Sequence, residues 1–422
     1  MLNNLRREKI LKSPFLRRVS MLVGGTAIGQ LIAIMALPIL TRMYEPEAFS
    51  TLAVYVSVLS MLTAIAGLCF EYAIPLPRSD RVAAALCLVA MGSVLAFTTV
   101  TMLVIVAFPY TFKTIISDKM HSFLWLIPVG VFFVGMYNAL QYWGTRNKKF
   151  TLIAKTRVTQ SLSGTVVKLG AGHFYSGSVF GLVLGQLIAQ GAGFITLGLS
   201  LLRNDWKVFN KLRYKHFLHA VSRYKNFPKF TTLEVFSNIG GMQIPVILIA
   251  YYSVGAEVGY LMIAMQLLSA PMGMLSGAVA QVYLAEAADK HHRGQLNEFT
   301  KKTITSLAKV SAIPLLLAGV MAPFLVPLLL GDPWQRTGIL ISWMVPWFFV
   351  QFITSPVSTI LYITENQRIA FVLQIMGLAI RVGFVVFAAY YTNNLIGEFY
   401  AVSGFIFYLL YFVVVLRVLK SV

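Results

Sequence analysis

Residues 19–75 read VSMLVGGTAIGQLIAIMALPILTRMYEPEAFSTLAVYVSVLSMLTAIAGLCFEYAIP, two long apolar stretches joined by a short acidic turn. The stretches 19–41 and 48–75 each reach the roughly 20 residues that a helix needs to cross a hydrocarbon core of about 30 Å. Similar stretches recur along the whole chain, and the alternating patterns of transmembrane barrels are absent. Because backbone amides need partners in lipid, the sequence predicts an all-α integral membrane protein.

Composition supports a membrane protein and excludes a soluble one. Of the 422 residues, 58% are hydrophobic and 12% are charged, whereas a soluble domain carries about 25% charged residues. We predict about twelve transmembrane helices in two pseudo-symmetric lobes of six. The predicted spans are 19–41, 48–75, 83–108, 122–144, 152–171, 177–202, 230–252, 256–284, 303–330, 337–363, 369–391 and 395–417.

The basic residues predict the orientation of the chain. With the N-terminus placed in the cytoplasm, 28 of the 35 Lys and Arg residues fall in cytoplasmic segments and four fall on the opposite side. This asymmetry follows the positive-inside rule of inner-membrane proteins. It predicts a multi-pass protein of the bacterial inner membrane with both termini in the cytoplasm. It also accounts for the net charge of +20 without a nucleic-acid partner.

The longest polar segment divides the chain into related halves. Acidic turns follow the first and seventh spans at 44–50 and 252–259, and basic or amide-rich turns precede the fifth and eleventh spans. These matches favour a duplicated six-helix unit, as in many transporters. The predicted segments are a cytoplasmic N-terminus 1–18, an N-lobe 19–202, a basic linker 203–229, a C-lobe 230–418 and a C-terminus 419–422.

Enzymatic and metal-binding motifs are missing from the sequence. It contains no phosphate-binding GxxxxGK[ST] loop, no nucleophile elbow and no HExxH, and Cys69 and Cys87 lie in apolar segments. We therefore expect no enzyme activity and no cofactor. The outward loops are short, which disfavours a membrane polymerase or ligase of polysaccharide assembly, since such enzymes usually need a sizeable outward loop.

The fifth predicted span carries a polar and basic stripe. Arg157, Ser161, Gly164, Thr165 and Lys168 recur at helical spacings of three and four residues. Charged residues are costly in lipid and usually face a cavity or a partner. One interpretation is the wall of a water-filled cavity that binds an anion through Lys168 and Arg157. The other is a buried helix whose cations are paired or extend to the inner surface.

The eleventh span, the counterpart of the fifth, carries Arg381 near the middle of the membrane. Cationic residues on equivalent helices suggest one cationic central cavity shared by the two lobes. Two carboxylates, Glu234 and Glu71, also lie in predicted spans. Each is a candidate for coupling to H⁺ or Na⁺, with the counter-ion of a nearby cation as the alternative; for Glu71 we favour the structural role.

Polar side chains on other spans are candidates for sugar contacts, because hydroxyls, amides and aromatic rings are the groups that contact sugars. The same groups also join transmembrane helices, so both interpretations stay open. These residues are Asn138, Gln351, Ser355, Tyr362 and Gln374.

Several segments carry a resemblance to a known family. They are Gly24–Gln30, Leu37–Arg42, Tyr44–Phe49 and Gln141–Trp143 followed by Arg146–Phe150. With twelve spans in two halves, the chain resembles the multidrug/oligosaccharidyl-lipid/polysaccharide (MOP) exporter superfamily. The quoted segments look more closely like the Wzx-type flippases of O-antigen and related surface polysaccharides.

This resemblance implies a function in lipopolysaccharide or other polysaccharide biosynthesis. Wzx-type flippases move undecaprenyl-diphosphate-linked repeat units from the cytoplasmic to the periplasmic leaflet, through a cavity that is typically cationic. Lys168 and Arg381 suit a diphosphate or acidic sugars. The implied partners are a lipid-linked oligosaccharide, membrane lipids and other assembly proteins, the last through 203–229.

A drug or cation antiporter of the MATE type and a peptidoglycan lipid-precursor flippase are the alternatives. Such antiporters often have an acidic residue deep in the first span, which this chain lacks.

Overall fold

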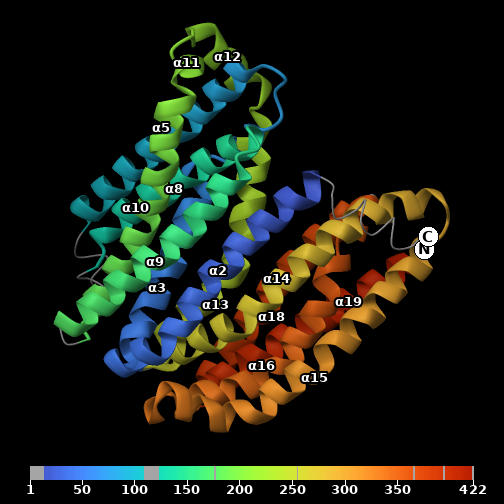
Figure 1. The fold of residues 1–422 in the computed structure, drawn as a ribbon. Helices are drawn as coiled ribbons and strands as arrows, with labels where there is room; N and C mark the ends of the chain where they lie inside the picture. Colours follow the sequence, from blue (N-terminus) through green and yellow to red (C-terminus); the bar gives the residue numbers. More distant parts are fainter. Residues whose placement is uncertain are drawn as a thin grey trace. The chain divides into compact units, whose positions relative to one another are not determined.

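The regular elements of the structure, a computed structural model, are all helices in the part of the chain that it describes (Figure 1). That part comprises residues 14–108, 123–174, 177–253, 255–364, 366–392 and 395–420. Most of the predicted N-terminal segment 1–18 and the end of 419–422 lie outside it. Helices satisfy their own backbone hydrogen bonds, as apolar surroundings require. The prediction of an all-α membrane fold is confirmed.

Ten helices in the described ranges are long and apolar enough to cross a membrane. Helices α8 (Leu126–Arg146) and α9 (Phe150–Phe174) occupy the positions of the fourth and fifth predicted spans but are not among the ten. In α9 the reason is visible in the sequence, since Lys155, Arg157 and Lys168 lower its apolar character. Each of the twelve predicted spans nevertheless has a long helix at its position.

The first of two compact units contains the described residues 14–40 and 58–239. In this unit α9 packs closely along α10, and α8 packs against both α5 and α10. Small buried residues at the start of α5 form the core of one end with Trp143 and Ala220. The elements are α2 (Pro14–Met43), α3 (Pro46–Ala66), α4 (Phe70–Ala73), α5 (Asp80–Ala107), α8, α9, α10 (Val179–Asn204), α11 (Trp206–Phe209), α12 (Tyr214–Arg223), η1 (Phe227–Thr231) and α13 (Thr232–Tyr252), with α2, α3 and α13 contributing in part.

The second unit contains residues 41–57 and 240–420 of the described chain. Helix α16 is central to it, packing against α14, α15 and α19, and α18 packs against α19. Besides parts of α2, α3 and α13, its elements are α14 (Glu257–His292), α15 (Leu296–Leu330), η2 (Asp332–Trp334), α16 (Gln335–Thr354), η3 (Ser355–Val357), α17 (Ile360–Ile363), α18 (Gln367–Tyr391) and α19 (Ile396–Lys420).

The chain passes from one unit to the other inside helices. The divisions fall after residue 40 in α2, after residue 57 in α3 and after residue 239 in α13. The basic segment 203–229, predicted as a linker between lobes, folds with the first unit as α11, α12 and the start of η1. Segment 41–57 joins the second unit, although its position in the sequence places it in the first half.

Two predicted spans are broken in the structure. The span predicted at 48–75 ends as α3 at Ala66 and resumes as α4 at Phe70, because Leu68 and Cys69 adopt left-handed φ values of 50° and 55°. The span predicted at 337–363 ends as α16 at Thr354 and continues through η3, whose second residue is Pro356. Proline removes a backbone donor and interrupts the regular helical ladder there.

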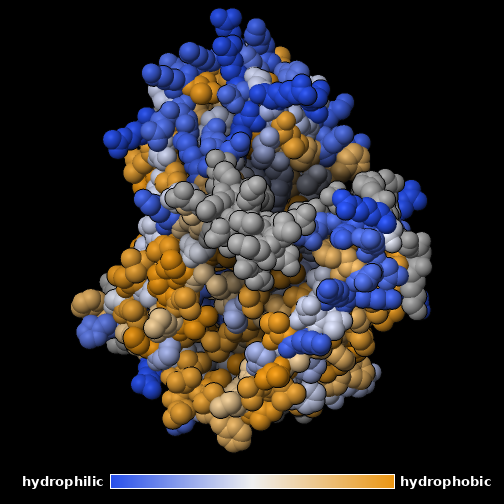
Figure 2. All heavy atoms as spheres, turned by 45° about the vertical axis from the view of Figure 1, so that its right-hand side comes forward, coloured by the Kyte–Doolittle hydropathy of each residue, from blue (hydrophilic) through white to orange (hydrophobic). Residues whose placement is uncertain are grey.

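Apolar side chains cover much of the surface, as expected of a protein that contacts lipid tails. Met35, Phe324 and Leu328 are each more than 70% exposed. Figure 2 shows hydrophobic side chains spread over a broad area of one face. An exposed apolar area of this extent is uncommon on a soluble monomer and marks a membrane or interaction surface.

Candidate functional site

The basic helix α9 packs between α2 and α10 in the first unit, and glycines set both interfaces. A Cβ built on Gly25 of α2 would stand 2.6 Å from the Cβ of Ala154, so the two helices approach this closely only with glycine there. One turn further along α2, the carbonyl oxygen of Gly29 accepts a hydrogen bond of 2.5 Å from the Ser161 hydroxyl of α9. Ser161, a member of the predicted polar stripe, therefore faces α2.

Lys168 lies on the side of α9 that contacts α10. Its aliphatic stem occupies the space beside Gly185, where an added Cβ would collide with the Lys168 Cγ. One turn earlier, a Cβ on Gly164 would stand 2.8 Å from the Cβ of Ala189. The two glycines leave room for the lysine stem between the helices. Binding of an anion by the Lys168 ammonium group stays a prediction.

Arg157 contacts neutral groups of α8 in the same unit. Its Nη2 donates to the Oε1 of Gln141 at 3.2 Å, and its guanidinium carbon lies 5.7 Å from the ring centroid of Tyr137. The Tyr137 hydroxyl is in turn 3.1 Å from the Thr156 hydroxyl. Within the described chain no carboxylate forms an ion pair with Arg157. Arg157 is half-buried at the contact of α9 with α8.

Arg381 of α18 is buried in the second unit, with 4% of its surface exposed. Its guanidinium carbon lies 4.7 Å from the ring centroid of Phe407 and 5.7 Å from that of Trp347. Its Nη1 donates to the carbonyl oxygen of Gly241 at 3.2 Å. Gly404 makes the arrangement possible, because a Cβ there would collide with the Trp347 indole. Aromatic faces stabilise a desolvated cation by about 2 kcal/mol.

The charge of Arg381 is not neutralised by any carboxylate in the described ranges. Its Nε is buried without a hydrogen-bond partner, and so are the Nε1 of Trp347, the Oε1 of Gln351 and the Oγ1 of Thr354. The last three residues share one face of α16, at spacings of four and three. A buried cation without a counter-ion is costly, and so are orphaned donors such as the Nε of Arg381 and the Nε1 of Trp347, whereas the Oε1 of Gln351 is an acceptor. The surroundings of Arg381 are therefore suited to an anion.

The two predicted coupling carboxylates both lie in the first unit, in the neighbourhood of Cys69. Both Glu71 and Glu234 are close enough to act electrostatically on the Cys69 thiol. Glu71 is 5% exposed, with its Oε2 unpartnered and its carboxylate against Gly67, whereas Glu234 is exposed. The sequence placed them on separate spans and did not indicate that both lie near the same thiol. Ion coupling by either group stays a prediction.

The predicted sugar contacts are dispersed over both units. Asn138 lies half-buried on α8 of the first unit, and Gln374 lies half-buried on α18 of the second. Gln351 is half-buried on α16, one turn beyond Trp347, while Ser355 is exposed in η3. The side chain of Tyr362 lies outside the described part. Lys168 and Arg381 belong to different units, and their shared cavity stays a prediction.

Sequence reasoning missed an ion-pair cluster in the second unit. Arg336 of α16 donates from Nη2 to Glu257 at 2.9 Å and makes a paired contact with both carboxylate oxygens of Glu398. Glu257 and Glu398 lie in the first turns of α14 and α19. The sequence shows acidic residues at the starts of two predicted spans and an arginine in a predicted outward loop. No motif or spacing in the sequence indicates that these three residues meet. The cluster ties three helices at the end predicted to face outward.

Segment 203–229 is also anchored by contacts that sequence reasoning did not identify. The Oδ2 of Asp205 accepts from the Trp143 indole at 2.9 Å and from the Lys149 ammonium group at 2.7 Å. Phe209 of α11 packs its ring edge-to-face on Trp143 at 5.0 Å. These contacts explain why the segment folds onto the first unit.

The fold is similar to that of solved transporters described as members of the MOP superfamily. The structure is similar to the lipid II flippase MurJ in an inward closed conformation, with a TM-score of 0.75 and 12% identity over 95% of this chain and 87% of that one. It is similar to an inward-facing multidrug resistance MATE family transporter, with a TM-score of 0.71 and 14% identity over 93% and 96% of the two chains.

A third similar structure is a MOP superfamily transporter from Pyrococcus furiosus whose binding pocket is described as having reversed polarity. Its TM-score is 0.62 and its identity 13%, over 96% of each chain. No curated protein sequence matches this chain. The family of polysaccharide biosynthesis proteins matches residues 39–338, well over half of the chain. The chain belongs to that family.

Proposed function

We propose that this protein is a flippase for lipid-linked oligosaccharides. It translocates undecaprenyl-diphosphate-linked repeat units of O-antigen or a related surface polysaccharide from the cytoplasmic to the periplasmic leaflet of the bacterial inner membrane. Its termini face the cytoplasm, in accordance with the distribution of basic residues. Membership in the polysaccharide biosynthesis family supports this proposal, and so does the likeness of the fold to that of a lipid II flippase.

The observation that carries the proposal is the environment of Arg381. A guanidinium that is buried among aromatic rings, without a described carboxylate partner, with its own Nε unpartnered and with the unpartnered indole N–H of Trp347 nearby, favours an anionic ligand. The proposed substrate carries a diphosphate. Arginine matches phosphate oxygens through paired hydrogen bonds, which a lysine does not provide.

The remaining predicted residues have roles in the same proposal. Lys168 and Arg157 add positive charge for the diphosphate, and Gln351 and Asn138 contact sugars. The polyprenyl chain stays in lipid while the headgroup crosses by alternating access. Glu234 or Glu71 couples the movement to H⁺ or Na⁺, or the supply of substrate drives it without coupling. Other polysaccharide assembly proteins contact segment 203–229.

A drug or cation antiporter is the second candidate, because the fold is also that of MATE transporters. Two observations weigh against it. The first predicted span, 19–41, contains no acidic residue, and the buried cation Arg381 of the second unit has no described carboxylate partner, whereas the buried carboxylate Glu398 is paired with Arg336. A cationic drug would be repelled by Arg381.

The experiment is depletion of the protein in its host, followed by extraction of lipid-linked sugars and an assay of the leaflet that they occupy. We expect intermediates to accumulate in the cytoplasmic leaflet and long surface polysaccharide to be lost. Lipid II accumulating in their place would identify the peptidoglycan precursor as the substrate. Unchanged surface polysaccharide together with new drug sensitivity would favour the antiporter.

Variants of the cationic residues test the anion site in the same cells. Arg381→Met and Lys168→Met keep the aliphatic volume and remove the charge, and each should reduce transport at least tenfold at an unchanged protein level. Lys309→Met is the matched control, because Lys309 is an exposed lysine within a span. Full transport by both test variants would refute the anion-binding role of Lys168 and Arg381.

A further inference from the structure

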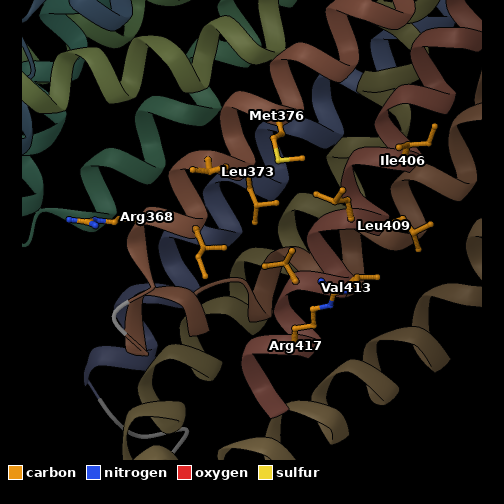
Figure 3. A pocket seen from close by; sticks show the side chains of 11 residues that line it. Arg368, Leu373, Met376, Ile406, Leu409, Val413 and Arg417 are labelled. Atoms are coloured by element: carbon orange, nitrogen blue, oxygen red, sulfur yellow. The ribbon is translucent and has the colours of Figure 1, made fainter. Parts of the chain in front are cut away.

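A groove of about 670 Å³ lies between α18 and α19 of the second unit (Figure 3). Its walls are apolar and include Val372 and Met376 from α18 and Leu409 and Val413 from α19. The two polar lining residues are Arg368 and Arg417, at the margins of the apolar cluster in Figure 3. This groove is separate from the surroundings of Arg381 and takes no part in the proposed function.

The groove extends over about half the thickness of a membrane. Arg368 is in the first turn of α18 and Arg417 in the last turn of α19, so both mark the same end of this antiparallel pair. Met376 is eight residues beyond Arg368, and Ile406 is eleven residues before Arg417. At 1.5 Å per residue the groove runs about 12–16 Å from the arginines. A hydrocarbon core is about 30 Å thick, so the groove covers one leaflet.

Two arginines place positive charge at one end of the groove. The side chains of Arg368 and Arg417 are both exposed, and neither forms an ion pair with a residue in the described ranges. Basic residues at this end belong to the cytoplasmic side according to the positive-inside rule. Two such guanidinium groups above an apolar groove match a phosphate headgroup whose acyl chain lies below it.

We propose that this groove is a binding site for an anionic glycerophospholipid of the cytoplasmic leaflet. One acyl chain lies along Val372, Met376 and Leu409, and Arg368 and Arg417 hold the phosphate. The occupant is a resident lipid rather than the transported one, because the groove ends near mid-membrane, whereas a translocated lipid has to reach the opposite leaflet. The inference stands independently of the proposed substrate.

The test is native mass spectrometry of the purified full chain, reconstituted in nanodiscs of phosphatidylcholine with 20 mol% dioleoyl phosphatidylglycerol. We expect one phosphatidylglycerol to be retained in preference to phosphatidylcholine. A basic residue near the surface contributes about 1 kcal/mol to anionic lipid binding. Arg368→Ala and Arg417→Ala should therefore each weaken retention about fivefold, and the double variant should remove the preference.

Two further variants separate the groove from general surface charge. Val372→Trp fills the groove while keeping both arginines, and it should displace the retained lipid. Lys301→Ala removes an exposed basic residue of α15 outside the groove and should have no effect. If the arginine variants do not fold, the wild-type preference and the Val372→Trp variant decide the question.

Three outcomes would overturn the inference. The first is equal retention of phosphatidylglycerol and phosphatidylcholine by the wild type. The second is unchanged retention in the double arginine variant or in Val372→Trp. The third is displacement of phosphatidylglycerol by undecaprenyl phosphate at an equal mole fraction, which would assign the groove to a polyprenyl chain. Because no transport is measured, failure of the proposed function would leave the result unaffected.

Discussion

Replacing Arg336 by alanine should markedly destabilise the second unit. The arginine holds Glu257 and Glu398, and the exposed fractions of the three side chains are 24%, 16% and 7%. Arg336→Ala leaves two poorly solvated carboxylates facing each other without a cation. Breaking a buried pair by removing one partner costs about 3–5 kcal/mol. Because the arginine retains some contact with solvent, we expect a loss of about 3 kcal/mol, at the lower end of that range.

Two further variants separate the contributions of the two ion pairs that Arg336 makes with Glu257 and Glu398. Glu257→Gln removes one charge but leaves Arg336 with its paired contact to Glu398, so about 1 kcal/mol should be lost. Both carboxylates accept two hydrogen bonds from Arg336, but Glu398 is the more buried partner and its contacts are shorter. The loss caused by Glu398→Gln should therefore fall between those of the other two variants.

Thermal unfolding in detergent, followed by tryptophan fluorescence, measures these losses. Trp334, Trp343 and Trp347 lie in the second unit, whereas Trp125, Trp143 and Trp206 lie in the first, so replacing the last three by Phe in all variants restricts the signal to the second unit. For a unit of 150–250 residues, each kcal/mol shifts the melting temperature by about 2–4 °C. We therefore expect Arg336→Ala to lower it by roughly 6–12 °C.

The control is Lys309→Ala, an exposed cation without a partner in the described chain, and its melting temperature should stay within about 1 °C of the wild type. The reasoning is refuted if the melting temperature of Arg336→Ala equals that of the Lys309→Ala control. It is also refuted if Glu257→Gln costs as much as Arg336→Ala, because the contact to Glu398 would then contribute nothing.

Three further predictions concern helix packing and polar contacts. Gly185→Leu should destabilise the first unit by about 2 kcal/mol or more in thermal unfolding, because the new side chain collides with the Lys168 stem; melting unchanged from the wild type would contradict the packing. Ser50→Ala should cost about 1–3 kcal/mol, because the buried N–H of Gly259 loses its acceptor at 2.8 Å; Ser50→Thr, which keeps the hydroxyl, should restore most of it. Asp205→Ala should increase proteolysis of segment 203–229 by removing the acceptor of an indole and an ammonium group, and an unchanged cleavage rate would show that the ring contacts alone hold the segment.

The sequence could predict the number and kind of long helices because each is specified locally. A span such as 19–41 is recognised from about twenty consecutive apolar residues, whatever its neighbours are. The distribution of basic residues likewise predicts an orientation without any tertiary information. Those predictions depend on the membrane as a solvent, which acts on each segment separately.

The sequence could not predict the break between α3 and α4 or which unit each helix joins. The break at Leu68 and Cys69 involves two residues that are ordinary within helices and carries no glycine or proline signal at those positions. The assignment of 41–57 to the second unit depends on the packing of Phe49 on Trp334, whose rings are 5.1 Å apart. Contacts between residues nearly three hundred positions apart leave no periodic pattern in the sequence.

The candidate site, too, could be predicted from the sequence only in part. That Arg381 and Lys168 are cations in apolar helices is evident from the sequence alone, because their transfer into lipid is costly. The sequence did not reveal that Arg381 is enclosed by Phe407 and Trp347 and lacks a described carboxylate partner, nor that Arg336 has two. Composition and spacing thus determined the helices and their charged residues. Only the tertiary structure decided which charges are neutralised, because neutralisation depends on distances of a few ångströms between separate helices.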